Sequence, residues 1–266
     1  KMIPLTSEGG QLEGQALYDE MLGGEWPLEA LDAWEPEAIV KRVRDAGIVG
    51  LGGAAFPTSV KLVRNEKKPV DVLLLNGCEC EPYLTADYRI MLEAAAGVLA
   101  GAQVAAKACG AAQIVVAMED NKPEALAVMK KAAEGTPVQV VAVETKYPMG
   151  GEKQTVSAVV GRTIPTGGLP LDVGVVVINV GTALAVARAV LRNGNLTHRV
   201  VTVTGAGIRE PKNLLVPMGV DYKTLIEYCG GLLPQAARII SGGPMMGFAV
   251  GSPDVPVTKG TSGLLV

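Results

Sequence analysis

The sequence predicts an α/β fold in which a mostly parallel sheet is covered by helices, followed by a small β-grasp domain. Short apolar runs such as Val70–Leu75 and Val173–Ile178 alternate with helical segments between residues 36 and 191. Strands of a parallel sheet are covered on both faces and therefore read as continuous apolar runs. Beyond residue 197 this alternation stops, and strand segments with one short helix follow up to residue 241, a pattern that indicates a β-grasp unit.

The composition of the 266-residue chain narrows the classes of function. Hydrophobic residues make up 48% and charged residues 19%, which allows a sizeable core and argues against disorder. The net charge is −3 without a basic tract, which disfavours a nucleic-acid partner. Long uncharged runs such as Ala94–Ala106 and Val173–Ala187 are shorter than the roughly 20 residues of a transmembrane helix. We therefore expect no direct membrane insertion.

The four cysteines do not follow a cluster-binding pattern. No C-x-x-C pair or iron–sulfur spacing is present. Cys78 and Cys80 are too close in sequence for an easy, unstrained disulfide, and the single histidine, His198, supplies no evident further metal ligand. Reduced thiols lining a pocket are therefore favoured over a soft-metal site, and a reducing cytoplasmic compartment fits them.

The first elements of the α/β domain can be placed by their end signals. A helix is expected at Pro36–Ala46, because proline suits a first turn and Gly47 supplies a C-terminal stop. A glycine-rich loop and a short helix follow, and then the strand Val70–Leu75. One long Ala-rich helix is expected over Thr85–Lys107, with Thr85 as its N-cap.

The rest of the chain continues in the same way. Asn121 followed by Glu124 and ended by Gly135 predicts a capped helix. The strands and helices expected in turn are Gln113–Met118, Asn121–Glu134, Val138–Val143, Gly150–Val160, Val173–Ile178 and Thr182–Leu191. In the second unit we expect strands at Arg199–Gly205, Asn213–Pro217 and Ala237–Ser241, and a helix at Tyr222–Cys229.

The glycine-rich loop is the first candidate binding element. Gly50, Gly52 and Gly53 allow backbone N–H groups to approach a ligand closely, and Lys61 on the next helix can supply a positive charge. The loop is neither a G-x-G-x-x-G turn nor a Walker loop. A simple tight turn is therefore the alternative interpretation.

Polar residues at the ends of two apolar strands form the second candidate. Asn76–Pro82 (NGCECEP) follow the first strand, and Asn179 and Thr182 stand where a later strand turns into a helix. Open α/β sheets bind ligands at the carboxyl ends of strands, and a helix start suits a phosphate. The alternatives are an ordinary capped helix start for Asn179 and Thr182, and a solvated sheet edge for Glu79 and Glu81.

Seven motifs together resemble a known family. They are GLGGAAFPT with Lys61, NGCECEP, YPMGGEKQ from Tyr147, GRTIPTGGLP from Gly161, INVGTALAV from Ile178, GGPMMG from Gly242 and KGTSGLL from Lys259. In this order they resemble the flavin-binding core of RnfC, the NADH-binding subunit of the Rnf ferredoxin:NAD oxidoreductase. That core is shared with the NADH-binding subunit of respiratory complex I, with PduS-type cobalamin reductases and with the RnfC-like carrier of proline reductase. The resemblance runs from about residue 38 to the end.

The resemblance, with the loop residues above, implies an FMN site in this chain. Its residues are Gly50, Gly52, Gly53, Lys61, Asn76, Glu79, Tyr147, Gly151, Glu152, Asn179 and Thr182. Phe56 and Glu81 are implied to lie toward the nicotinamide nucleotide. No catalytic residue is expected, because the flavin performs the chemistry. Glu152 also follows two glycines at an expected helix start, where an acid is favourable without any flavin.

Two residues depart from the family pattern. Ala55 stands where the family usually has glycine, so the loop is strained if that position requires a positive φ. Lys153 stands where the complex I subunit has a second glutamate near NADH, a feature that RnfC-like proteins share. This lysine favours RnfC over complex I and weakens the NADH inference.

Four regions are expected along the chain. They are an N-terminal segment (1–34), an FMN- and NADH-binding α/β domain (35–196), a β-grasp domain of the SLBB type (197–250) and a C-terminal segment (251–266). In the first region, Ile3-Pro4-Leu5 resembles the family's opening strand. The last leads toward a ferredoxin-type domain that the sequence does not contain. The sequence begins with Lys1 rather than Met, which fits a fragment.

The function implied by the resemblance is electron transfer. FMN exchanges hydride with NAD(H) and single electrons with iron–sulfur centres, and 4Fe–4S clusters are expected only in a further C-terminal region or a partner. The expected partners are other subunits of a membrane electron transport complex, or a partner reductase with a ferredoxin-type protein. The chain is expected in the cytoplasm, peripheral on the inner face of the cell membrane.

Two other functions are compatible with the same residues. One is a soluble RnfC-like carrier for proline reductase or cobalamin reductase, and the other is a non-catalytic binding module with a degenerate flavin site. In the flavin interpretation, the motifs at Gly50–Pro57, Asn76–Glu81, Gly150–Glu152 and Asn179–Thr182 should converge on one cleft. The β-grasp unit is expected to form a separate sheet that leaves this cleft intact.

Overall fold

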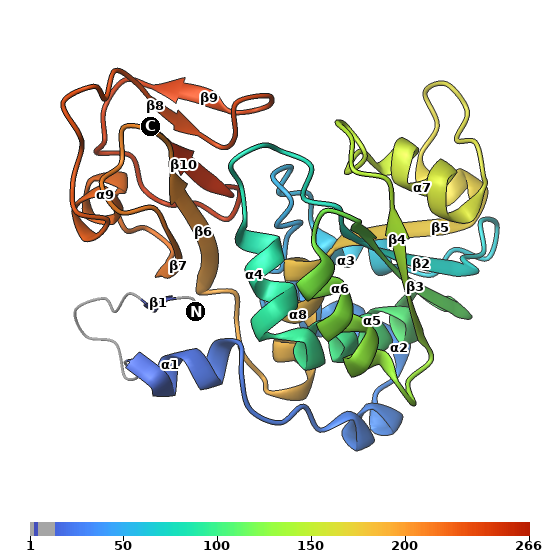
Figure 1. Ribbon diagram of the computed structural model, residues 1–266. Helices are drawn as coiled ribbons and strands as arrows, with labels where there is room; N and C mark the ends of the chain where they lie inside the picture. The colour runs from blue at the N-terminus through green and yellow to red at the C-terminus, as the bar shows by residue number, and fades with distance from the viewer. Residues whose placement is uncertain (1–2, 5–13) are drawn as a thin grey trace.

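The computed structural model describes residues 3–4 and 14–266 and arranges them around two sheets (Figure 1). The first is a four-stranded parallel sheet in the order β4-β3-β2-β5. Its strands are β2 (Val72–Gly77), β3 (Gln113–Glu119), β4 (Val138–Val143) and β5 (Val175–Asn179). Because all four run in one direction, their carboxyl ends meet at one edge. The predicted parallel sheet is confirmed.

Helices cover both faces of this sheet (Figure 1). Along β2, Leu73 and Leu75 belong to one core, whereas Val72 and Leu74 belong to another. This alternation is the period of two of a strand buried on both sides. The helices of this part are α1 (Gly14–Met21), α2 (Pro36–Asp45), α3 (Thr58–Leu62), α4 (Ala86–Glu93), α5 (Ala95–Cys109), α6 (Pro123–Ala133), α7 (Glu152–Val160) and α8 (Val180–Leu191).

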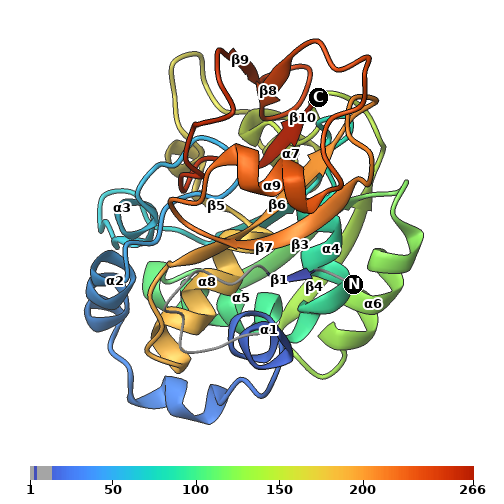
Figure 2. The same cartoon turned by 90° about the vertical axis from the view of Figure 1, so that its left-hand side faces the viewer.

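The second sheet has six strands in the order β1-β7-β6-β10-β8-β9, with α9 packed on it (Figure 2). Its elements are β1 (Ile3–Pro4), β6 (His198–Thr204), β7 (Lys212–Pro217), α9 (Tyr222–Tyr228), β8 (Ile239–Ser241), β9 (Phe248–Val250) and β10 (Gly263–Leu265). The expected opening strand is present at Ile3–Pro4, and Leu5 lies outside the described residues.

This sheet extends beyond residues 197–250, which differs from the self-contained unit that the sequence suggested. β10 lies between β6 and β8, and β1 pairs with β7. An inner strand hydrogen-bonds on both sides, so the C-terminal segment holds the two halves of the sheet together. Residues 198–250 alone would leave β6 and β8 unpaired along the edges that face β10.

The prediction of a single helix over Thr85–Lys107 is wrong. Two helices, α4 and α5, meet at Ala94 with a bend of 95°. Helix α5 lies on the sheet with most of its residues buried, whereas α4 turns away and contacts β6 of the second sheet. Ala94 adopts φ −132° and ψ 28°, outside the helical region. Tertiary packing sets this break, because neither proline nor glycine marks it.

None of the described helices is by itself long and apolar enough to cross a membrane. Helices α4 and α5 meet that criterion only when they are joined across the 95° bend.

Smaller differences lie at the ends of elements. Helix α6 begins at Pro123, and Asn121 does not cap it, because its side-chain oxygen accepts a hydrogen bond from Lys122 Nζ at 3.1 Å. Helix α7 begins at Glu152, since Gly151 is still extended. The strand expected from Val173 begins at Val175, after a 3-10 turn. In each case the element begins two residues later than predicted, because the loop before it is longer than the sequence pattern indicates.

Candidate cofactor-binding cleft

A cleft of about 550 Å³ lies between the carboxyl edge of the parallel sheet and the second sheet. This volume is within the range of small-molecule and cofactor sites. Six segments form its walls: the glycine loop, the turn after β2, the start of α4, the loop before α7, the junction of β5 with α8, and parts of the second sheet. The expected convergence of the four motifs on one cleft is confirmed.

The predicted site residues divide between the wall of the cleft and its surroundings. Those that line the cleft are Gly52, Gly53, Asn76, Glu79, Glu81, Tyr147, Gly151 and Asn179. Those that lie outside its lining are Gly50, Phe56, Lys61, Glu152 and Thr182.

The second sheet does not leave the cleft intact as a separate unit, which corrects the expectation from the sequence. Arg199 of β6, residues 241–243 and 246–248 around the β8–β9 turn, Gly260 and Ser262 all line it. The reason is the position of β6, which packs against α4 and so brings its sheet against the carboxyl edge of the first.

The glycine loop is closed by its own backbone and anchored from both sides. The Gly50 N–H donates to Phe56 O at 2.8 Å, which closes the loop. The Leu51 N–H donates to Thr182 Oγ1 at 2.8 Å, and Leu51 O accepts from Arg199 Nη2 at 3.1 Å. The next three amides, at residues 52–54, have no hydrogen-bond acceptor within the part of the chain that the structure describes. Residues 52–54 line the cleft, and free backbone amides in such a loop can bind an anion.

Ala55 occupies a left-handed backbone conformation with φ +51°. A side chain in this region costs roughly 1–2 kcal/mol relative to glycine, because Cβ approaches the following carbonyl oxygen. The strain anticipated from the sequence is therefore present. It lies at the base of the loop, where the Ala55 N–H donates to Gly50 O at 3.2 Å.

The start of α8 is capped by the chain itself. Asn179 Oδ1 accepts hydrogen bonds from the amides of Gly181 (2.8 Å) and Thr182 (3.2 Å). Asn179 Nδ2 donates to Asp87 Oδ2 at 2.6 Å. The two amides that could have received a phosphate are thus occupied, and the hydroxyl of buried Thr182 holds Leu51. The anion-binding donors of this cleft lie in the glycine loop.

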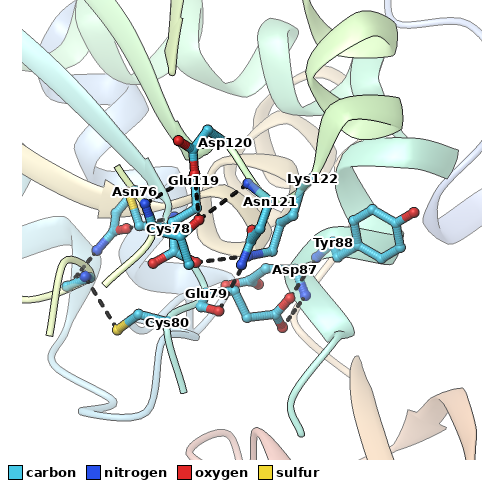
Figure 3. Close-up of polar contacts among 12 residues, drawn as sticks. Asn76, Cys78, Glu79, Cys80, Asp87, Tyr88, Glu119, Asp120, Asn121 and Lys122 are labelled. Atoms are coloured by element: carbon cyan, nitrogen blue, oxygen red, sulfur yellow. Dashed lines mark hydrogen bonds and ion pairs between the residues drawn. The ribbon is translucent and has the colours of Figure 1, made fainter. Parts of the chain in front are cut away.

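The turn after β2 is tied to the loop before α7 (Figure 3). Asn76 Oδ1 accepts from the Cys78 amide at 3.0 Å, and Asn76 Nδ2 donates to Gly150 O at 2.7 Å. The Gly150 N–H in turn donates to Cys80 Sγ at 3.3 Å. Cys80 lines the cleft, whereas Cys78 is fully buried in the core beneath it. Of the two thiols expected to line a pocket, only Cys80 does so.

Glu79 caps the start of α4, although it lies several residues before the helix in the sequence. Its two carboxylate oxygens accept from the backbone amides of Asp87 (2.8 Å) and Tyr88 (2.9 Å) (Figure 3). Thr85, the expected cap, instead directs its hydroxyl toward Asn213 Oδ1 at 3.2 Å. Removal from water in the cleft wall, with repulsion from Asp87, raises the pKa of the Glu79 carboxyl. Burial likewise raises the pKa of Asp87.

A buried ion pair supports this turn from behind and was not predicted. Lys122 Nζ donates to Glu119 Oε2 at 3.0 Å and to the Glu79 carbonyl at 3.4 Å (Figure 3). Glu119 Oε1 is buried and has no hydrogen-bond partner among the described residues. The sequence signal was present, because Glu119 is a charged residue that directly continues an apolar strand.

Lys61 and Glu152 pair with each other outside the cleft. The Lys61 Nζ to Glu152 Oε1 distance is 2.5 Å, and Nζ also donates to the Val177 carbonyl of β5 at 3.0 Å. This pair joins α3 to the start of α7 across the edge strand. Phe56 is 47% exposed, and Tyr147, at the rim of the cleft, is 40% exposed.

Arg199 is the principal site residue that the sequence reasoning missed. The residue is 5% exposed, and its guanidinium donates to Leu51 O and Lys259 O. Burial lowers its pKa to about 10, while the negative charge of Asp87 acts in the opposite direction. Lys259 Nζ donates to Gly47 O at 2.6 Å, so the second sheet and its C-terminal segment hold the glycine loop at two carbonyls. The available signal was a charged residue at the start of the segment RVVTVT, whose other residues are valines and threonines.

Glu81 bridges the two sides of the cleft. Its Oε1 accepts from the amides of Met245 (2.7 Å) and Met246 (2.9 Å) in the β8–β9 turn. The carboxylate is thereby engaged by the protein itself.

Comparison with known families assigns most of the chain. The model of the Nuo51 FMN-binding domain matches residues 43–188, and the model of the SLBB domain matches residues 200–249. An NAD⁺-reducing [NiFe]-hydrogenase in the H₂-reduced state shares the fold, with a TM-score of 0.72 and 22% identity over 92% of this chain and 51% of that one.

Two bacterial proteins are clear relatives in sequence. One is a component of the proton-translocating ferredoxin:NAD⁺ oxidoreductase complex of Clostridium ljungdahlii, which is 54% identical over 84% of this chain and 49% of its own length. The other is the corresponding component of the Na⁺-translocating complex of Acetobacterium woodii, which is 45% identical over 90% and 54%. The chain spans about half the length of these relatives. The resemblance to RnfC is confirmed, and the chain belongs to the family of the Nuo51 FMN-binding domain, here followed by an SLBB domain.

Proposed function

We propose that the chain is the flavin module of an Rnf-type ferredoxin:NAD oxidoreductase and that it holds FMN in the cleft between its two sheets. The observation that carries this proposal is the convergence of the flavin motifs on one cleft that also presents three free backbone amides. When bound, FMN supplies both hydride exchange with NAD(H) and single-electron transfer. The protein contributes binding, orientation and electrostatics.

The groups in the cleft suit a flavin nucleotide. The amides of residues 52–54 can donate to its phosphate, beside the buried charge of Arg199. Glu79 and Asp87 present acceptor oxygens, which match the hydroxyl groups of a ribityl chain. Asn76, Tyr147 and Gly151 line the same wall. The donors and acceptors thus occupy different segments of one cleft.

The predicted residues outside the wall act on this site through other groups. Gly50 closes the loop, and Thr182 anchors it at Leu51. Lys61 and Glu152 fix α3 against the start of α7. We assign Phe56, outside the wall, and Glu81, which lines it, to the side of the cleft from which a nicotinamide nucleotide approaches.

The relatives suggest the setting of the reaction. Their names describe subunits of ion-translocating ferredoxin:NAD⁺ oxidoreductase complexes. We propose that this chain works with the other subunits of such a complex, peripheral to its membrane part. Electrons would leave toward 4Fe–4S centres in a further region of the protein or in a ferredoxin-type partner.

Anaerobic titration of the purified chain tests this function. FMN should bind in one-to-one ratio, and adding NADH should bleach the visible flavin absorbance. If FMN does not bind even in excess, the chain is a binding module without flavin chemistry. If FMN binds and NADH leaves the absorbance unchanged, the flavoprotein assignment stands and the NADH assignment is wrong.

A further inference from the structure

The contact between Glu81 and the β8–β9 turn joins two walls of the cleft. Glu81 belongs to the turn after β2, and Met245 and Met246 belong to the hairpin at the far edge of the second sheet. Both segments line the cleft. A single carboxylate oxygen accepts both amides, at 2.7 and 2.9 Å. Charge-assisted hydrogen bonds of this kind are roughly twice as strong as neutral ones.

Apart from the Gly242 N–H, which donates to Gly263 O of β10 at 2.7 Å and fixes one end of the turn, little else holds it in place. Met245, Met246 and Phe248 are exposed by 54%, 79% and 67%, so no large apolar side chain from the turn is buried. The turn is tight, because the Gly247 N–H donates to Gly243 O at 2.9 Å. β9 is a three-residue edge strand with pairing on one side only. Segments with few buried apolar contacts are those that open locally at small cost.

We propose that residues 242–247 form a gate over the cleft, that Glu81 is its latch, and that an arriving nucleotide opens the gate by taking this carboxylate. An ionised carboxylate only accepts hydrogen bonds. The ribose hydroxyls and the carboxamide of a nicotinamide nucleotide are donors, and they compete with the amides of Met245 and Met246 for the same oxygen. The identity of the nucleotide rests on the function proposed above, whereas the latch rests on the contacts alone.

Gly243 provides a way to open the latch without removing the carboxylate. A Cβ at this position would overlap Glu81 Cγ and lie 2.5 Å from its Oε1. Gly243 has no positive φ, so alanine adds no backbone strain there, and the atoms it displaces, Glu81 Cγ, Cδ and Oε1, can move together by rotation of the Glu81 side chain about its Cα–Cβ bond. Gly243→Ala should therefore push Glu81 off the turn. Gly251→Ala is the matched control, because Gly251 also lacks a positive φ and has no atom within 4 Å of the added carbon.

Amide hydrogen exchange of the turn tests the latch without any ligand. We expect Met245 and Met246 to exchange roughly tenfold faster or more in Gly243→Ala and in Glu81→Gln than in the unaltered chain, because each loses charge-assisted hydrogen bonds. Gly251→Ala should exchange like the unaltered chain. Equal exchange in all four proteins would overturn the proposal, since the carboxylate would then not hold the turn.

NADH reduction of the FMN-loaded protein tests the gate. Gly243→Ala should lower the NADH concentration needed for half-maximal reduction by a few-fold, because the competing amides are gone and the carboxylate remains. Glu81→Gln should raise it, because the acceptor for the nucleotide is weakened. If both variants raise it equally, the turn is a fixed wall of the site and the gate is excluded. If neither the unaltered chain nor any variant is reduced by NADH, the NADH assignment fails while the flavoprotein assignment stands. Hydrogen exchange on adding NAD⁺ then decides the gate: unchanged protection of Met245 and Met246 excludes it.

Discussion

Asp87 determines which way the Asn179 amide faces. Asn179 Nδ2 donates to Asp87 Oδ2 at 2.6 Å, so Asn179 Oδ1 is left to accept from the amides of Gly181 and Thr182. The backbone amide of Asp87 is itself held by Glu79 at 2.8 Å. Through these contacts the starts of α4 and α8 are joined in the wall of the cleft.

Replacing Asp87 separates its acceptor role from its charge. Asp87→Asn keeps an oxygen that Asn179 Nδ2 can reach, whereas Asp87→Leu leaves this amide buried without an acceptor. We expect Asp87→Leu to lower the free energy of unfolding by about 1–3 kcal/mol, and Asp87→Asn to cost less. Urea denaturation measures this difference. Equal losses in both variants would show that the hydrogen bond to Asn179 is not what Asp87 contributes.

The carboxyl pair of Glu79 and Asp87 predicts a pH dependence with a definite sign. Both pKa values are raised in the folded protein, so it holds more protons than the unfolded chain above the ordinary carboxyl pKa of about 4. The contribution of this pair to the free energy of unfolding is therefore greatest below that pH. It falls as the pH rises through the raised pKa values of the two carboxyl groups. Lys122 and Arg199 oppose the shifts and limit the fall.

Denaturation from about pH 4 to about pH 9 measures this fall against the double variant Glu79→Gln, Asp87→Asn. The difference in stability between the unaltered chain and this variant should move in favour of the variant as the pH rises. A difference that is flat, or that moves in the other direction, would contradict the raised pKa values.

Ala55→Gly should stabilise the protein. Relief of the left-handed strain gains roughly 1–2 kcal/mol, and the greater freedom of glycine in the unfolded chain removes roughly 0.4–1 kcal/mol of this. We expect a net gain of about 0.5–1 kcal/mol in the free energy of unfolding. Ala54→Gly is the control, since Ala54 has no positive φ and should gain nothing. If both changes stabilise the protein equally, the gain comes from glycine anywhere in this loop and not from relief of the left-handed conformation of Ala55.

Arg199→Lys should loosen the glycine loop from the second sheet. A lysine carries one compact ammonium group and cannot reach both Leu51 O and Lys259 O as the guanidinium fork does. We expect FMN affinity to fall about tenfold, equivalent to roughly 1.4 kcal/mol. Arg238→Lys, at an exposed position just before β8, should leave the affinity unchanged. Fluorescence titration with FMN compares the affinities of the unaltered chain and the two variants. If Arg199→Lys binds FMN as tightly as the unaltered chain, the contact of the second sheet with the glycine loop does not contribute to cofactor binding.

The sequence by itself determined the fold class and most of the local structure. The apolar runs that became β2 to β5 and the signals that opened α2 and α8 act over a few residues, and such signals can be read directly. It also determined which motifs meet at the cleft, because the carboxyl ends of parallel strands share one edge whatever the details of packing. The strain at Ala55 follows in the same way from one departure in a loop motif.

Only the tertiary structure decided how the cleft is completed. The bend at Ala94 has no local cause, since α5 follows the sheet while α4 follows the second sheet. Arg199 reaches Leu51 across 148 positions of the chain, and Glu81 reaches Met245 across 164. β10 enters between β6 and β8 from the end of the sequence. These contacts depend on how two sheets meet in space, and side-chain pairing over such separations leaves no periodic pattern along the chain.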